Sequence, residues 1–159
     1  MSNSRAIDIV YSYRSGDTDV YSALFKAWEE GVKPLQGIAG LQIVLLTQPH
    51  PVTNGTNSLG LEPGRKDEVV TVLTGAYTRR EDDEVVQAGM EAIVEAQKAI
   101  LEENGLLIPF QYLNYADIYQ DPIAGYGDEV KARLQDVSRR YDPDGVFQKQ
   151  VPGGFKVFP

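Results

Sequence analysis

Cysteine is absent from the 159-residue sequence, and histidine occurs only once, as His50. The chain therefore has no disulfide, no thiolate metal site and no cysteine nucleophile. With one imidazole available we expect no metal site. The carboxylates at residues 81–84 are better explained as the start of a helix, where negative charge is favourable.

Basic residues are also scarce, with 15 Lys and Arg against 23 Asp and Glu and a net charge of −8. Such a chain binds nucleic acid poorly, because phosphate contacts need clustered Lys and Arg. No apolar run is long enough to span a membrane, and residues 1–15 hold no apolar signal-peptide core. We expect one cytoplasmic domain, residues 1–159, with neither nucleic acid nor a membrane as its partner.

Motifs for nucleotide binding and for common hydrolases are missing. The sequence contains no HExxH, no GxSxG, no GxxxxGK[ST] and no GxGxxG. These patterns place metal ligands, a nucleophilic serine or phosphate-binding backbone groups at fixed spacing. The sequence therefore shows no visible cradle for a dinucleotide or a nucleoside triphosphate.

Regular strand and helix signals fill the first two thirds of the chain. Apolar side chains at every second position, as in residues 7–13, are typical of a strand. The predicted strands cover residues 7–13, 40–47, 68–78 and 106–115. The predicted helices run from Asp17 to about Gly31 and from Asp82 or Asp83 to Gly105. The order βαββαβ over residues 1–115 predicts an α+β, ferredoxin-like fold, an antiparallel sheet with helices on one face.

Three further segments complete this interpretation. The strand at 40–47 is apolar on both faces, which predicts that both faces are covered. Residues 116–159 are predicted to form a C-terminal helix, at 128–141, and an extended tail rich in Gly and Pro. Long connections, at 48–66 and 115–127, are of a kind that often carries function. We expect His50, on the first of them, to be a solvent-exposed loop residue, with a general base as the alternative.

Tyrosine is the enriched polar residue, with nine in all. On a strand, Tyr112 and Asn114 would point to the same face. A phenol beside a carboxamide can hold and polarise a carbonyl or a phenolate. From spacing alone the plainer interpretation is a sheet-face aromatic residue followed by one that ends the strand.

The C-terminal third resembles the end of fungal FAD-linked oxidases of the berberine bridge enzyme-like group. The similarity is strongest in YLNYAD at residues 112–117 and YDPDGVFQ at 141–148, and it continues at 120–123, 126–127 and 152–156. TNSLGL at 56–61 is similar to a glycine-rich element of the same group, with Thr56 in place of its second glycine.

The resemblance implies a substrate domain in which one sheet face lies over a flavin and a substrate. It also implies that Tyr112 and Asn114 lie at that face, near the isoalloxazine ring, and that the tail packs against a flavin-binding domain. The family's flavin-binding element, of the type Arg-Ser-Gly-Gly-His, has no counterpart here. Residues 14–17 are superficially similar but lack the histidine.

We therefore expect a cofactor-independent enzyme of fungal secondary metabolism, a cyclase or isomerase acting on a small hydrophobic or phenolic substrate. It would catalyse conjugate addition, pericyclic cyclisation or dehydration by positioning and proton transfer. Tyr112 would donate or accept the proton and Asn114 would polarise a carbonyl, with Arg14 or Arg79 as a cation that lowers the pKa of the phenol. The weaker candidates for substrate binding are Tyr11, Tyr13, Gln42, His50, Asn57, Tyr77 and Arg79.

The alternative is a fragment or subunit of an FAD-dependent oxidoreductase that is not catalytic by itself. Its FAD would come with a flavin domain supplied by a partner, because the cofactor carries the hydride chemistry. A plain ferredoxin-like binding module is the third interpretation. For the enzyme we expect a homodimer through the bare sheet face, since exposed apolar surface favours association.

Overall fold

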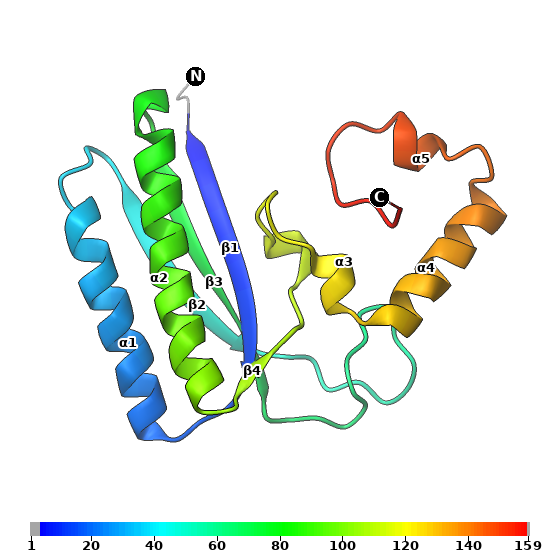
Figure 1. The fold of residues 1–159 in the computed structure, drawn as a ribbon, viewed down its shortest axis with the longest axis horizontal. Coiled ribbons are helices and arrows are strands. Elements are labelled where there is room, and N and C mark those ends of the chain that lie inside the picture. Colours follow the sequence, from blue (N-terminus) through cyan, green and yellow to red (C-terminus); the bar gives the residue numbers. More distant parts are fainter. Residues whose placement is uncertain (1–3, 159) are drawn as a thin grey trace.

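The sheet contains four antiparallel strands in the order β2-β3-β1-β4 in the computed structural model, which describes residues 4–158 (Figure 1). The strands are β1 (Arg5–Arg14), β2 (Gln42–Pro49), β3 (Glu68–Tyr77) and β4 (Leu107–Ile108). β1 and β3 pair along their whole length, from Arg5 opposite Tyr77 to Arg14 opposite Glu68. β2 pairs with the other side of β3, and β4 with the other side of β1.

Helices α1 (Thr18–Val32) and α2 (Asp83–Glu103) lie together on one face of this sheet (Figure 1). α1 begins after Asp17, whose carboxylate accepts the N–H groups of Asp19 and Val20, each at 3.1 Å. This is the N-cap geometry that aspartate favours. The short turns η1 (Lys33–Leu35) and η2 (Arg80–Asp82) follow α1 and precede α2. The order of elements and strands confirms the predicted ferredoxin-like α+β fold.

The main core lies between the helices and the sheet. The odd positions of β1 point into it, and α2 contributes an apolar stripe at helical spacing, Val86, Met90, Ile93, Val94 and Leu101. Burying each large apolar side chain stabilises the fold by about 1.5–3 kcal/mol. One amide crosses this core: Gln97 of α2 accepts the hydroxyl of Tyr11 through Oε1 and donates Nε2 to the carbonyl of Leu24, each at 3.0 Å.

The prediction that β2 is covered on both faces is wrong. Val44 and Leu46 are 56% and 46% exposed. The strand register places them opposite Thr74 and Val72, on the face turned away from the core. The helices cover only one face of the sheet, and the C-terminal part of the chain lies beside β1 and away from β2 (Figure 1).

The predicted strand at 106–115 is also wrong in length, because β4 ends at Ile108. Pro109 follows, and proline has no backbone N–H with which to continue a ladder. The chain then forms turn η3 (Leu113–Tyr115), α3 (Pro122–Gly125), α4 (Asp128–Tyr141) and α5 (Val146–Lys149). α4 was predicted, whereas η3, α3 and α5 have no counterpart among the predicted elements.

A second apolar cluster holds this C-terminal part together. It consists of Leu61, Phe110 and Tyr126, with half-buried side chains packed around them. Leu61 comes from the long connection between β2 and β3, so that connection is part of the same unit. Among residues 4–158 no helix combines the length and the apolarity that crossing a membrane requires.

Candidate functional site

Turn η3 brings together Tyr112 and Asn114, the two residues predicted to be catalytic. Asn114 Nδ2 donates a hydrogen bond to Tyr112 Oη at 2.9 Å. The ring of Tyr115 meets that of Tyr112 edge to face, with 5.1 Å between the centroids. The predicted reason for their proximity, a shared strand face, is wrong: a 3-10 turn brings the two side chains together.

The pair offers two donors to one ligand. The Tyr112 oxygen accepts from Asn114, so its own O–H remains free to donate, and the carboxamide keeps a second N–H. Asn114 is exposed and Tyr112 half-buried. Two such donors aimed at one oxygen can bind a carbonyl or stabilise a phenolate.

A stack of aromatic rings supports turn η3. Tyr126 Oη accepts the backbone N–H of Leu113 at 3.2 Å. The Tyr126 ring stacks on Phe110 with 5.5 Å between centroids, and Phe110 meets the His50 ring edge to face at 4.7 Å. Burial raises the pKa of Tyr126, which keeps the phenol neutral and its oxygen in place as an acceptor.

The loop containing Asn57 supports the same stack. Asn57 Oδ1 accepts the N–H groups of Leu59 and Leu61 at 3.0 and 3.1 Å, and Nδ2 donates to the carbonyl of Leu61 at 2.8 Å. Gly60, at φ +73°, lies against Tyr126, whose carbonyl oxygen would be 2.1 Å from an added Cβ. The side-chain amide of Asn57 is thus engaged within its own loop, and its role in substrate binding stays a prediction.

His50 is buried, which makes the expectation of a solvent-exposed loop residue wrong. Its backbone N–H donates to the carbonyl of Glu68 at 2.9 Å, so the pairing of β2 with β3 continues and carries the imidazole inside. Nε2 lies 3.2 Å from Ser12 Oγ, and Nδ1 lies 3.5 Å from Glu68 Oε2. Burial lowers the pKa of His50, and the Glu68 carboxylate opposes this shift.

The other predicted lining residues do not gather around Tyr112. Tyr11 and Tyr13 are 3% and 2% exposed in the helix-covered core, where burial raises the pKa of both phenols. Gln42 lies on the opposite sheet face, beside Ala76. The structure therefore separates these side chains. The sequence could not predict this, because alternation indicates which residues share a face but not which face the helices cover.

Two more of them lie at the far end of β1 from β4. Tyr77 donates to Asp83 Oδ1 at 2.8 Å, and Arg79 forms ion pairs with Glu81 and Asp82. Arg79, one of the two cations expected to assist Tyr112, is therefore engaged elsewhere.

A hollow of about 600 Å³ lies between β1, α2 and the loop at 117–119. Carboxylates dominate its charged lining: Asp83, Glu84, Glu91 and Asp117, with Arg5 as the one cation. A hollow of this charge repels the diphosphate of FAD, so it does not fit that cofactor. Within residues 4–158, no three His, Asp or Glu side chains are grouped so as to hold a metal ion.

Comparison with known proteins finds similarity to fungal proteins, several of which are named FAD-dependent monooxygenases. It is 43% identical over 103 residues to the FAD-dependent monooxygenase FUP4 of Fusarium proliferatum, covering 65% of this chain and 20% of that protein. It is 36% identical over 143 residues to the FAD-dependent monooxygenase tpcD of Cochliobolus heterostrophus, covering 89% and 27%. It is 28% identical over 149 residues to the bifunctional solanapyrone synthase of Alternaria solani, covering 89% and 28%.

The chain thus spans about a fifth to just over a quarter of the length of these relatives. No family model matches the sequence, and no solved structure matches it. The similarity over most of this chain is to one part of fungal FAD-dependent monooxygenases.

Proposed function

We propose that this chain is the substrate-facing part of an FAD-dependent oxidoreductase of the berberine bridge enzyme-like group. The observation that carries the proposal is the similarity to proteins named FAD-dependent monooxygenases over 65% to 89% of the chain. The motifs at 112–117 and 141–148 support the narrower assignment. Its substrate would be a small hydrophobic or phenolic product of fungal secondary metabolism.

Tyr112 and Asn114 are the residues that would touch this substrate. Their 2.9 Å hydrogen bond fixes the phenol oxygen, and each side chain keeps one N–H or O–H with which to bind a substrate oxygen. The stack of Tyr126 and Phe110 holds the turn rigid, which favours catalysis because the donors need no reorganisation. FAD, held by other parts of such an oxidoreductase, would supply the redox chemistry.

A cofactor-independent cyclase or isomerase is the second candidate. The Tyr112–Asn114 pair favours it, because two donors on one oxygen are sufficient to polarise an enone or to protonate an enolate. The relative named a synthase covers 89% of this chain and supports the same direction. In this case the exposed Val44 and Leu46 of β2 would form part of a homodimer interface.

The visible spectrum of the protein purified from its natural source separates the two candidates. Absorption bands at roughly 370 and 450 nm, where bound flavin absorbs, are expected for the oxidoreductase. The first proposal would be overturned, and the second supported, by a colourless protein that converts a phenolic substrate. Its spectrum and its oligomeric state would also be unchanged by added FAD.

A further inference from the structure

The outer edge of β1 is largely unpaired. β4 pairs with it only at Ser12 and Tyr13. The next rung is filled by a side chain, because Gln120 Oε1 accepts the N–H of Val10 at 3.0 Å and Nε2 donates to its carbonyl at 2.7 Å. Backbone groups of alternate residues point to the same edge of a strand. The N–H and C=O groups of Ala6 and Asp8 therefore point outward as well, and no strand within residues 4–158 pairs with them there.

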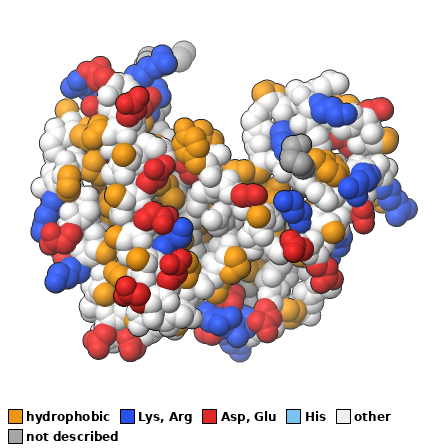
Figure 2. Space-filling model, in the orientation of Figure 1, with side chains coloured by type: hydrophobic (Ala, Val, Ile, Leu, Met, Phe, Trp, Pro, Cys, Tyr) orange, Lys and Arg blue, Asp and Glu red, His pale blue; other side chains and the backbone are white. Residues whose placement is uncertain are grey.

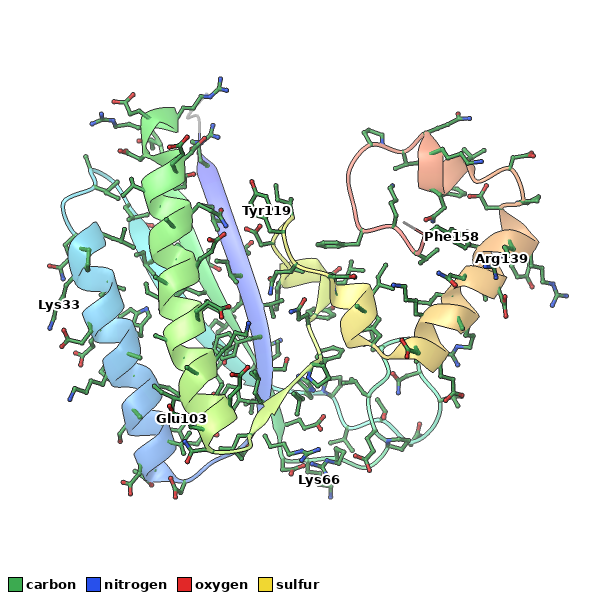
Figure 3. All side chains as sticks on the ribbon, in the orientation of Figure 1. Lys33, Lys66, Glu103, Tyr119, Arg139 and Phe158 are labelled. Atoms are coloured by element: carbon green, nitrogen blue, oxygen red, sulfur yellow. The ribbon has the colours of Figure 1, made fainter. Side chains whose placement is uncertain are left out.

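A hollow lies beside this unpaired edge. The hollow of about 600 Å³ is lined by Ala6 and Ile7 of β1 and by Ala88 of α2. A second one, of about 320 Å³, extends it past Ile9 and shares lining residues of α2 and of the loop at 117–119 with it. Figure 3 labels Tyr119 on that loop, and its side chain is 75% exposed. The first hollow thus has backbone donors and acceptors on one side and apolar residues such as Ile7 and Ala88 in its lining, whereas the second is lined mainly by polar side chains.

The negative charge around the hollow favours a positively charged ligand. Glu84 and Glu91 of α2 and Asp117 of the loop line it, and Figure 2 shows acidic side chains spread along the α2 surface. Arg5 is already bound, because its guanidinium donates twice to Asp83. Lys98 lines the second hollow and is paired with Glu95 at 2.8 Å. Among the described lining residues no basic side chain is paired with Glu84, Glu91 or Asp117, so a cationic group is favoured there.

We propose that the β1 edge binds an extended peptide segment of a partner protein that carries Lys or Arg at alternate positions. The segment would pair with Ala6 and Asp8 as an added strand, a mode in which main-chain hydrogen bonds give affinity and side-chain pockets give specificity. Since strand side chains alternate between faces, every second side chain would meet Glu84, Glu91 and Asp117.

Binding of a labelled Lys-Val-Lys-Val-Lys-Val peptide to the full chain tests the proposal. We expect saturable binding, weakened at least about tenfold by the double change E91Q/D117N. The matched control, E29Q/E103Q, removes the same charge from exposed positions away from the hollow and should leave the affinity within about twofold. Equal weakening by both pairs would overturn the proposal in favour of unspecific charge attraction.

Two further readouts separate strand pairing from other occupants. The same peptide methylated at alternate backbone nitrogens should bind weakly, and unmethylated peptide should slow hydrogen exchange at the amides of Ala6 and Asp8. Equal binding of the methylated peptide, or of free lysine amide, would overturn the proposal and point to a small amine. Protection of these amides that depends on protein concentration without peptide would overturn it in favour of a second copy of the chain.

Discussion

At the scale of single residues, the hydrogen bond between Asn114 and Tyr112 bears most directly on function. We expect Tyr112→Phe to reduce turnover at least about tenfold, because a proton donor to the substrate oxygen is lost. The free energy of unfolding should change by less than about 0.5 kcal/mol, since the exposed Asn114 amide can bond to water. Steady-state kinetics and urea unfolding measure the two effects. Tyr119→Phe is the control, and equal turnover in both variants would remove Tyr112 from the mechanism.

His50 makes a second prediction, about pH. Burial lowers its pKa in the folded state below the unfolded value of about 6.5, so between the two values only the unfolded state binds the proton. The free energy of unfolding is therefore highest above pH ~6.5, where His50 is neutral in both states, and it falls as the pH drops below this value. Urea unfolding at a series of pH values should show this slope, and His50→Gln should flatten it. A wild-type stability that rises on acidification would mean that attraction to Glu68 outweighs burial.

His50 also shows why residue-level prediction from sequence is incomplete. The flanking prolines indicated a loop, and the side chain is buried because β2 pairing continues through its backbone. The same limit applies to Tyr11 and Tyr13. Their common face could be predicted, but not that the helices cover this face. The Tyr112–Asn114 proximity was predicted, although the turn that produces it was not.

At the scale of elements, Gly125 sets how closely α3 packs on the segment after β4. An added Cβ would lie 2.4 Å from the carbonyl oxygen of Pro109, and backbone cannot move aside as a flexible side chain does. We expect Gly125→Ala to lower the free energy of unfolding by about 1–3 kcal/mol through overpacking. Gly37→Ala is the matched control, because no atom lies within 4 Å of its added Cβ. Equal unfolding free energies for the two variants would contradict this packing.

Gln97 joins three elements, β1, α1 and α2, through one buried amide. We expect Gln97→Met to lower the free energy of unfolding by about 1–3 kcal/mol, because the Tyr11 hydroxyl loses its acceptor in the core. The double variant Q97M/Y11F should regain part of this loss, since both polar partners are then gone. A double variant that is less stable than the sum of the single changes would contradict this explanation.

Most elements could be predicted from periodicity, because the helices and the three long strands each carry a sustained pattern. The exception is the region after Gly105, where alternation in 106–115 suggested one long strand. Pro109 breaks the ladder there. The following residues, Tyr112 and Leu113, pack on a cluster that includes Phe110 and Tyr126, two residues far apart in the sequence. Tertiary contacts of this kind leave no local signal, so η3 and α3 could not be found from sequence.

At the scale of the whole molecule, the two apolar clusters differ in how many helices and strands they join. The main core involves both long helices and all four strands, whereas α4 has no buried residue. Elements with few buried contacts open locally at a lower free energy than the core. Native-state hydrogen exchange should therefore show α4 amides exchanging well before those of α2. Protection of α4 equal to that of α2 would mean that the chain unfolds as one cooperative unit.

The two hydrogen bonds between Gln120 and Val10 also limit how far an added ladder can extend along the β1 edge. An added strand has only the edge of residues 5–9 to follow, about 17 Å at ~3.4 Å per residue. An edge of that length closes after a short ladder, whereas long open edges template the growth of fibrils. One glutamine side chain thus leaves β1 only a short open edge, which limits edge-to-edge growth between copies of the chain.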